Sequence, residues 1–135
     1  MSAKPFLDTN ILIYAFASND ARAAPAEELL SAGGVVSIQV LNEFVNVSRR
    51  KLGRTWLQIE EALGVLKALL DPPVVLTAAL HEAAIAMARD HGFSFYDSLI
   101  IAAAVQAKCA VLYSEDMQDG RVIGALTIRN PFAAA

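Results

Sequence analysis

Cysteine, histidine and charged residues are all scarce in this chain of 135 residues, and each scarcity excludes a class of site. Cys109 is the only cysteine, which rules out an intrachain disulfide and a cysteine metal cluster. The chain has only two histidines, His81 and His91, which argues against a zinc site built on nitrogen ligands. Any metal site in this chain would therefore rely on oxygen ligands.

Long apolar runs are missing too, although apolar residues make up 56% of the chain, above the usual share of about 45–50%. A membrane-spanning helix needs about 20 consecutive apolar residues, and the best candidate, Leu99 to Val105, is far shorter. The N-terminus lacks the layout of a signal peptide, because Asp8 interrupts its first apolar run. We therefore expect a soluble, cytoplasmic protein without membrane contact, whose surplus of apolar surface favours an oligomer or a partner protein.

Positive charge is not in excess, since the formal net charge at pH 7 is −3. The chain as a whole is therefore not a generic electrostatic binder of nucleic acid. Its one basic cluster comprises Arg49, Arg50, Lys51 and Arg54. This cluster has two interpretations: ordinary cations at a helix C-terminus, or a patch that contacts phosphates or an acidic partner.

Short apolar runs bounded by turn signals alternate along the sequence with longer runs that have helical spacing. The short runs predict strands at 5–8, 35–38, 74–76 and 110–113, and a fifth at 126–128. The longer runs predict helices at 11–17, 21–31, 39–52, 55–70, 78–90 and 95–108. This alternation predicts one α/β domain over 1–132, with a short tail at 133–135. Its central sheet would be mainly parallel, with four to five strands and helices on both faces.

Four carboxylates stand where apolar runs begin or end: Asp8, Glu43, Asp97 and Asp116. An acid among apolar residues is costly unless it is paired, hydrogen-bonded or bound to a metal. Mutual repulsion raises that cost if the fold brings several acids together. Ligands of parallel sheets bind at the carboxyl ends of the strands, and Asp8 and Asp116 both follow predicted strands. A divalent cation at this rim would remove the repulsion.

Each acid also has a structural interpretation. Asp8 could end a strand and cap the helix that follows, and Glu43 could be a solvated helix residue. Asp97 fits a capping box that begins at Ser94, and an acid in the first helical turn is favoured by the helix dipole. The structural and functional interpretations of Asp97 are therefore evenly balanced. Asp119 stands before a glycine and most simply serves a turn.

The joint pattern is stronger than any single assignment. Ligands that are all oxygen favour Mg²⁺ or Mn²⁺ over zinc. Such an ion polarises phosphoryl oxygens, activates a water and steadies the leaving oxygen, so hydrolysis of a phosphodiester is the natural chemistry. A phosphotransferase with Asp8 as nucleophile is a weaker alternative, because Asn10 stands where that chemistry usually needs a second acid. Glu115, beside Asp116, is expected to be solvated.

These motifs together match a family pattern. The chain resembles the PIN-domain ribonucleases and, within them, the toxins of bacterial VapBC-type toxin–antitoxin pairs. The segments that carry the resemblance are Phe6-Leu7-Asp8-Thr9-Asn10, Ser37, Glu43, Phe95-Tyr96-Asp97-Ser98, Ser114-Glu115-Asp116-Met117-Gln118-Asp119-Gly120 and Ile128-Arg129-Asn130-Pro131-Phe132.

The resemblance implies a Mg²⁺- or Mn²⁺-dependent endoribonuclease with RNA as its substrate. Its catalytic, metal-binding acids would be Asp8, Glu43, Asp97 and Asp116, and its supporting polar residues would be Asn10, Ser37, Ser114 and Asp119. It further implies a homodimer and a cognate antitoxin protein whose C-terminal segment covers the acidic groove. The net acidity departs from the strongly basic surface expected of a free RNA binder. A non-catalytic PIN-like module that binds a cation or a basic partner segment remains the alternative.

Overall fold

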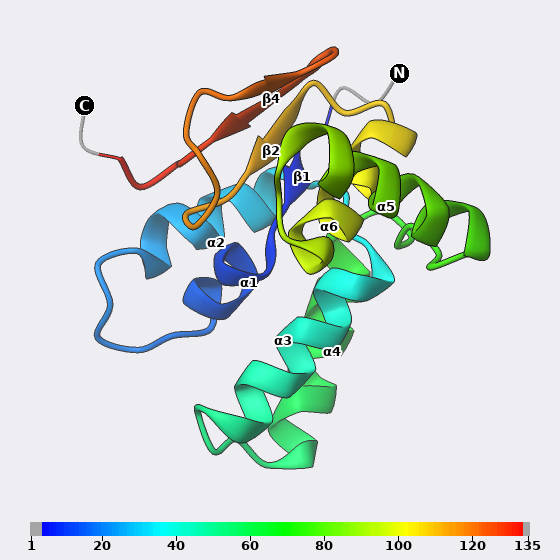
Figure 1. Cartoon of the computed structure of the whole chain (residues 1–135). Helices are drawn as coiled ribbons and strands as arrows, with labels where there is room; N and C mark the ends of the chain where they lie inside the picture. The colour runs from blue at the N-terminus through cyan, green and yellow to red at the C-terminus, as the bar shows by residue number, and fades with distance from the viewer. Residues whose placement is uncertain (1–3, 134–135) are drawn as a thin grey trace.

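The computed structural model describes residues 4–133 (Figure 1). Within them one short strand is followed by six helices and then by three further short strands, so the predicted alternation of regular strands and helices is not observed. The elements are β1 (Phe6–Leu7), α1 (Thr9–Ala15), α2 (Ala23–Ala32), α3 (Ile38–Arg50), α4 (Trp56–Leu69), α5 (Ala78–His91), α6 (Phe95–Gln106), β2 (Val111–Tyr113), β3 (Val122–Ile123) and β4 (Leu126–Arg129). None of the described helices is long and apolar enough to cross a membrane. All six predicted helices are present, with ends that differ by a few residues.

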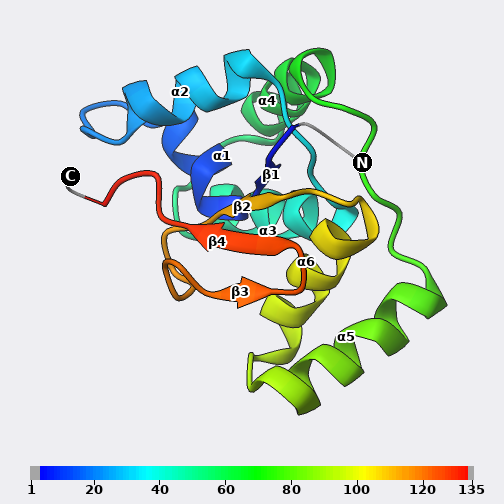
Figure 2. The same ribbon diagram turned by 90° about the horizontal axis from the view of Figure 1, so that it is seen from above.

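The strands form one sheet in the order β1-β2-β4-β3. The pairs β1–β2 and β2–β4 are parallel, whereas β3 pairs antiparallel with β4. Figures 1 and 2 show α1 and α2 on one side of the strands and α5 and α6 on the other. The prediction of a mainly parallel sheet with helices on both faces is therefore confirmed.

The prediction of strands at 35–38 and 74–76 is wrong, because neither segment forms a regular strand. Within the described residues they form only the isolated parallel bridges Phe6–Val35 and Ser37–Val74. The first segment is cut short because Ser37 is already the N-cap of α3. The second follows Pro72 and Pro73, which have no backbone N–H to donate to a sheet. These bridges still continue the sheet beyond β1 for a residue or two.

The hydropathy pattern does not predict β3. The strand has only two residues, and the side chain of Val122 is 62% exposed, so it lacks the continuous apolar run of a buried strand. Gly124, with a φ of 58°, forms the turn between β3 and β4. This positive φ explains how so short a hairpin closes, because glycine adopts it without steric cost.

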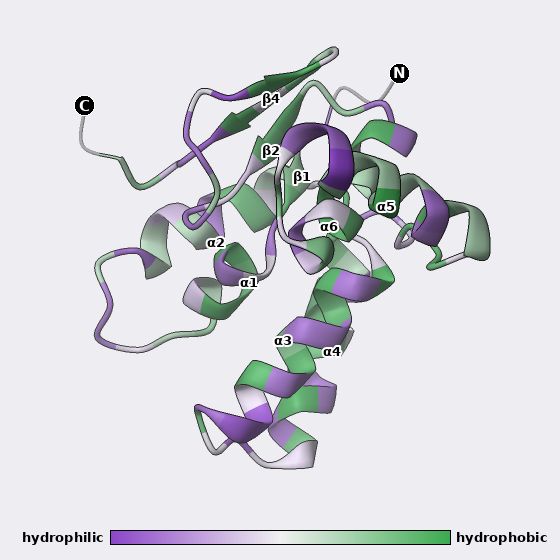
Figure 3. Ribbon diagram, in the orientation of Figure 1, coloured by the Kyte–Doolittle hydropathy of each residue, from purple (hydrophilic) through white to green (hydrophobic). Residues whose placement is uncertain are grey.

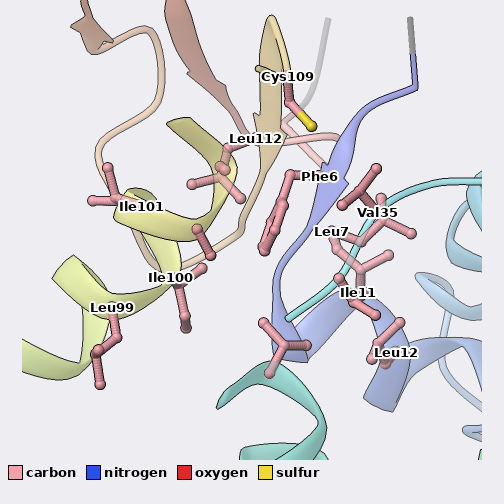
Figure 4. Close-up of a cluster of buried hydrophobic side chains, with 14 of the residues drawn as sticks. Phe6, Leu7, Ile11, Leu12, Val35, Leu99, Ile100, Ile101, Cys109 and Leu112 are labelled. Atoms are coloured by element: carbon pink, nitrogen blue, oxygen red, sulfur yellow. The ribbon is translucent and has the colours of Figure 1, made fainter. Parts of the chain in front are cut away.

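The core fills both faces of β1 (Figure 4). Phe6 and Leu7 are fully buried, and Figure 4 shows Phe6 pointing towards Ile100 of α6 while Leu7 points towards Val35. Helix α6 is buried at every residue from 98 to 104, which explains why its sequence has no polar face. This packing fixes the carboxyl ends of β1 and β2 and the N-terminal turn of α6.

Helices α3 and α4 form a hairpin that projects from the body of the molecule (Figure 1). At its tip, the guanidinium of Arg49 lies 4.9 Å from the ring centroid of Trp56 and donates to the carbonyl oxygen of Arg54 (3.0 Å). Arg54 in turn donates to the carbonyl oxygen of Phe16 (3.1 Å). Two members of the basic cluster thus stabilise the hairpin, in line with the structural interpretation.

Candidate active site

Asp8 lies between β1 and α1 and is almost completely buried, with 6% of its surface exposed. Its Oδ1 accepts a hydrogen bond from the backbone N–H of Thr9 (2.7 Å), and its Oδ2 accepts one from the hydroxyl of Ser114 (2.7 Å). The parallel pairing of Leu7 with Tyr113 explains this contact, because it brings the residues after β1 and β2 to the same rim. Asp8 therefore caps a helix and also belongs to a buried polar site.

Ser114 joins Asp8 to the loop that carries Asp116. Besides donating to Asp8, its hydroxyl oxygen accepts a hydrogen bond from the backbone N–H of Met117 (3.3 Å). This bond folds residues 114–117 into a tight turn after β2, and the side chain of Met117 is buried beneath it. Asp116 remains exposed at the rim. Ser114 thus positions two of the four acids.

Glu43 lies in the middle of α3, half-buried, and both of its carboxylate oxygens accept hydrogen bonds. Gln39, one turn earlier in the helix, donates its Nε2 to Oε2 (3.1 Å), and Thr9 donates its hydroxyl to Oε1 (3.3 Å). Since Thr9 follows Asp8 directly, this second bond brings Glu43 to the same rim. Glu43 is therefore not a freely solvated helix residue.

Asp97 lies in the first turn of α6, half-buried. The hydroxyl of Ser94 accepts a hydrogen bond from the Asp97 backbone N–H (3.2 Å), so Ser94 caps the helix as predicted. Within residues 4–133 the Asp97 carboxylate makes no capping bond back to the Ser94 backbone, whereas Gln58 completes a full capping box with Thr55 at the start of α4. The predicted capping box of Ser94 and Asp97 is therefore not completed.

Electrostatic coupling links the four carboxylates. The pKa of Asp8 is raised to about 6. Burial is the main cause and the charges of Glu43 and Asp97 add to it, whereas the hydrogen bonds from Ser114 and Thr9 oppose the rise. Burial also raises the pKa of Glu43, to which the Asp97 charge adds. The pKa of Asp97 is raised mainly by burial, a side-chain hydrogen bond with Ser94 opposes the rise, and the charge of Asp116 adds to it. Asp8, Glu43 and Asp97 thus lie close enough to repel one another, and Asp116 lies close enough to repel Asp97.

The arrangement is open rather than a closed cage. Among residues 4–133, no three acid, histidine or cysteine side chains stand at direct metal-ligand spacing. Mg²⁺ commonly keeps several of its waters and is bound through one or two carboxylates together with substrate phosphates, so an open set of acids suits it better than zinc. The oxygen donors and the raised pKa values both fit a hard divalent cation.

The predicted supporting residues other than Ser114 make hydrogen bonds to the backbone of loops and helix ends. Asn10 accepts a long hydrogen bond from the backbone N–H of Glu115 (3.5 Å), and its Nδ2 is buried without a partner among the described residues. Ser37 caps α3 by accepting from the backbone N–H of Val40 (3.2 Å). Asp119 accepts from the backbone N–H of Asn130 (2.9 Å), which ties its turn to the end of β4.

Glu115 takes part in a hydrogen-bond network that the sequence does not predict. The expectation that Glu115 is solvated is therefore wrong. Arg22 donates to both Glu115 oxygens (3.1 and 3.0 Å), and Tyr14 donates its hydroxyl to one of them. The Arg22 guanidinium also lies 3.8 Å from the Tyr14 ring centroid and pairs with Asp20. The network anchors the loop that carries Asp116. Because Arg22 and Glu115 are 93 positions apart, no local signal could reveal it.

The family model of the PIN domain matches residues 6–120 of this chain. The chain belongs to the PIN-domain family. The matched segment contains all four carboxylates and all of their hydrogen-bond partners described above. A search of the curated proteins found none with significant sequence similarity to this PIN-domain chain.

Solved structures of similar fold support this classification. The chain is similar to VapC20 of Mycobacterium tuberculosis, described as a Sarcin-Ricin loop cleaving toxin (24% identity, 82% of this chain and 88% of that one, TM-score 0.69). It is also similar to a chain of a toxin–antitoxin complex from Klebsiella pneumoniae (20% identity, 96% of this chain and 99% of that one, TM-score 0.71). A third similar structure is VapBC2 of Rickettsia felis bound to a DNA fragment from its promoter (21% identity, 93% of this chain and 96% of that one, TM-score 0.66). At these identities the likeness establishes a shared fold.

Proposed function

We propose that this PIN-domain chain is a Mg²⁺- or Mn²⁺-dependent endoribonuclease and the toxin of a type II toxin–antitoxin pair. The observation that carries the proposal is a set of four carboxylates from four separate segments that are linked by their charges. The charges of Glu43 and Asp97 raise the pKa of Asp8, and the charge of Asp116 raises the pKa of Asp97. The similar structures, a Sarcin-Ricin loop cleaving toxin, a toxin–antitoxin complex and VapBC2, support the same function.

Asp8, Glu43, Asp97 and Asp116 would hold the cation. When bound, the ion would polarise a phosphoryl oxygen, activate a water for in-line attack and steady the leaving oxygen. Ser114 and Thr9 fix the orientation of the Asp8 carboxylate, since each donates to a different oxygen. Glu43, whose pKa is raised by burial, can accept the proton of the attacking water at a carboxylate oxygen.

The proposal includes two protein partners, a second copy of this chain and a cognate antitoxin. Several large apolar side chains are exposed on α4 and near it, as expected of a chain that buries surface in a complex. They are Trp56, Leu57, Val65, Leu69 and Val75. An RNA substrate in the cytoplasm would place the protein there as well.

Purified protein, free of antitoxin, is expected to cleave structured RNA when Mg²⁺ or Mn²⁺ is present and to lose that activity in EDTA. The measurement is gel analysis of a diverse panel of structured RNAs after incubation at pH 7. Restoring Mn²⁺ after EDTA treatment controls for irreversible damage. If no RNA in the panel is cleaved under any of these conditions, the non-catalytic PIN-like module is the better description.

The toxin role is a separate prediction. Expression of the chain without an antitoxin is expected to arrest bacterial growth, and expression of Asp8→Asn at the same level is expected to be harmless. Immunoblotting verifies that both proteins accumulate equally. Equal harmlessness of the two proteins would contradict the toxin role even if RNA cleavage were observed in vitro.

A further inference from the structure

A cavity of about 380 Å³ opens beside the acid site. It is lined by Gln39, Asn42, Glu43, Asn46 and Tyr96, so four of its residues come from α3 and one from the first turn of α6. Glu43 belongs both to this cavity and to the set of coupled carboxylates. A group bound in the cavity would therefore be next to a phosphate bound at the acids.

Two unused side-chain amides face this cavity. Asn42 and Asn46 are exposed and lie one turn apart on the same side of α3. Figure 3 shows that α3 as a whole carries several hydrophilic bands. Within residues 4–133, neither side-chain amide makes a hydrogen bond, whereas the Gln39 amide is engaged by Glu43. Each free amide offers donors and an acceptor side by side, the combination that the edge of a nucleobase requires.

Tyr96 supplies an aromatic ring on the α6 side of the cavity. It is 64% exposed, although it directly precedes Asp97 of the acid site. The ring of Phe95 meets it edge-on, with centroids 5.6 Å apart, which steadies the ring while most of it stays in water. An exposed aromatic beside polar amides is the common arrangement for stacking an unpaired base.

The charge of the cavity points to a base rather than to a phosphate. Its lining contains one acid, Glu43, and no cation. A phosphate would be repelled there, whereas a neutral base would not. The first cation further along α3 on this side is Arg50, one turn beyond Asn46.

We propose that Tyr96, Asn42 and Asn46 form a nucleobase pocket that holds an unpaired base adjacent to the phosphodiester that is cut. This inference rests on the proposed nuclease function and names the part of the substrate that the same site reads. Tyr96 stacks on the base, and the two asparagines hydrogen-bond its edge. The pocket thus selects single-stranded or looped RNA, since a base within a duplex cannot enter it.

The first test is nuclear magnetic resonance titration of ¹⁵N-labelled, metal-free protein with adenosine, guanosine, cytidine and uridine. These nucleosides lack a phosphate, so their binding does not depend on the cation. We expect the side-chain amide signals of Asn42 and Asn46 to shift, and one nucleoside to bind more tightly than the others. Tyr96→Leu should weaken binding about tenfold or more, as for loss of a stacking ring, and Tyr96→Phe should preserve it.

The second test measures kcat/KM on short single-stranded RNAs that differ only in the base beside the cleaved bond. Tyr96→Leu and Asn42→Ala should reduce the ratio between the best and worst base, while the Mn²⁺ concentration for half-maximal activity stays unchanged. Trp56→Leu, which removes another exposed ring at the hairpin tip, is the matched control and should leave the ratio intact.

The two tests separate the pocket from the nuclease function. Nucleoside binding at Asn42 and Asn46 without RNA cleavage by the wild type would retain the pocket and refute the nuclease function. Active cleavage with an unchanged base ratio in Tyr96→Leu would refute the pocket and retain the function. Nucleoside-induced shifts confined to the hairpin tip around Arg50 would also overturn the pocket.

Discussion

Replacing Asp8 with asparagine is expected to abolish RNA cleavage and at the same time to stabilise the metal-free protein at pH 7. The activity falls because the buried carboxylate that anchors the acid set loses its charge. We expect a decrease of more than about a hundredfold, comparable to the loss of one strong transition-state contact. A substitution that lowers the activity but raises the stability identifies an acid that serves function, because loss of a structural acid would lower the stability.

The stabilisation follows from the raised pKa. Asp8 has a pKa of about 6 in the folded protein, against an ordinary value of 3.8. Below about pH 3.8 the Asp8 carboxyl is protonated in both the folded and the unfolded protein, so it does not affect the free energy of unfolding. Between pH 3.8 and pH 6 the carboxyl ionises in the unfolded chain but stays protonated in the folded protein, so the folded state becomes less stable as the pH rises. Above pH 6 the carboxyl is ionised in both states, and the whole loss of stability remains. At about 1.4 kcal/mol per pKa unit, that cost reaches up to about 3 kcal/mol at pH 7.

Asparagine can keep two contacts of the acid, although the buried Ser114 hydroxyl then loses the acceptor for its own proton. Its Oδ1 can accept from the Thr9 N–H as Asp8 does, and its Nδ2 can donate to the Ser114 hydroxyl oxygen, which then acts as acceptor. The substitution therefore removes the buried charge and costs one buried hydrogen bond, which lowers the net gain in stability by about 1 kcal/mol. We expect a gain of about 2 kcal/mol at pH 7 that fades towards pH 4.

Urea unfolding of wild type and Asp8→Asn in EDTA at pH 7 and pH 4 measures this difference. Glu60→Gln, which removes the charge of an exposed acid on α4, is the matched control and should change stability by less than about 0.5 kcal/mol. A variant that is inactive but less stable than wild type at pH 7 would show that Asp8 serves the fold.

Mn²⁺ or Mg²⁺ is expected to raise the melting temperature of the wild-type protein strongly at pH 7 and weakly at pH 5. The cation relieves the repulsion among Asp8, Glu43 and Asp97, but at low pH protons compete for the same carboxylates because their pKa values are raised. An ion at a hundred times its dissociation constant stabilises a protein by about 2.7 kcal/mol. For a domain of this size that corresponds to a shift on the order of 10 °C.

Thermal unfolding with and without Mn²⁺ at the two pH values tests this prediction. Asp8→Asn should show a much smaller shift at pH 7, and Glu60→Gln should behave as the wild type. An equal shift at both pH values, or an equal shift in Asp8→Asn, would place the bound ion elsewhere on the protein.

Much of the fold could be predicted because its signals are local. Thr55, Thr77 and Ser94 each cap a helix that the sequence pattern predicts, and Gly92, with a φ of 77°, ends α5. The segments 35–38 and 74–76 are as apolar as true strands, but a helix cap and two prolines keep them from pairing regularly. Hydropathy reports burial and does not report how many backbone partners a segment finds.

The acids of the candidate site could be singled out because each stands where an apolar run begins or ends. Their supporting contacts mostly could not, because they join residues far apart in the chain. The bonds from Ser114 to Asp8 and from Arg22 to Glu115 span 106 and 93 positions. The bond from Gln39 to Glu43 spans a single helical turn and was within reach of the sequence pattern. Long-range hydrogen bonds depend on strand register, which a single sequence does not specify.

Isothermal titration of Mn²⁺ into the purified protein at pH 7 tests the central claim most directly, namely that the four carboxylates form one divalent-cation site. We expect saturable binding to the wild type and to Glu60→Gln, and at least about tenfold weaker binding to Asp8→Asn. Equal affinities for the wild type and Asp8→Asn would contradict it.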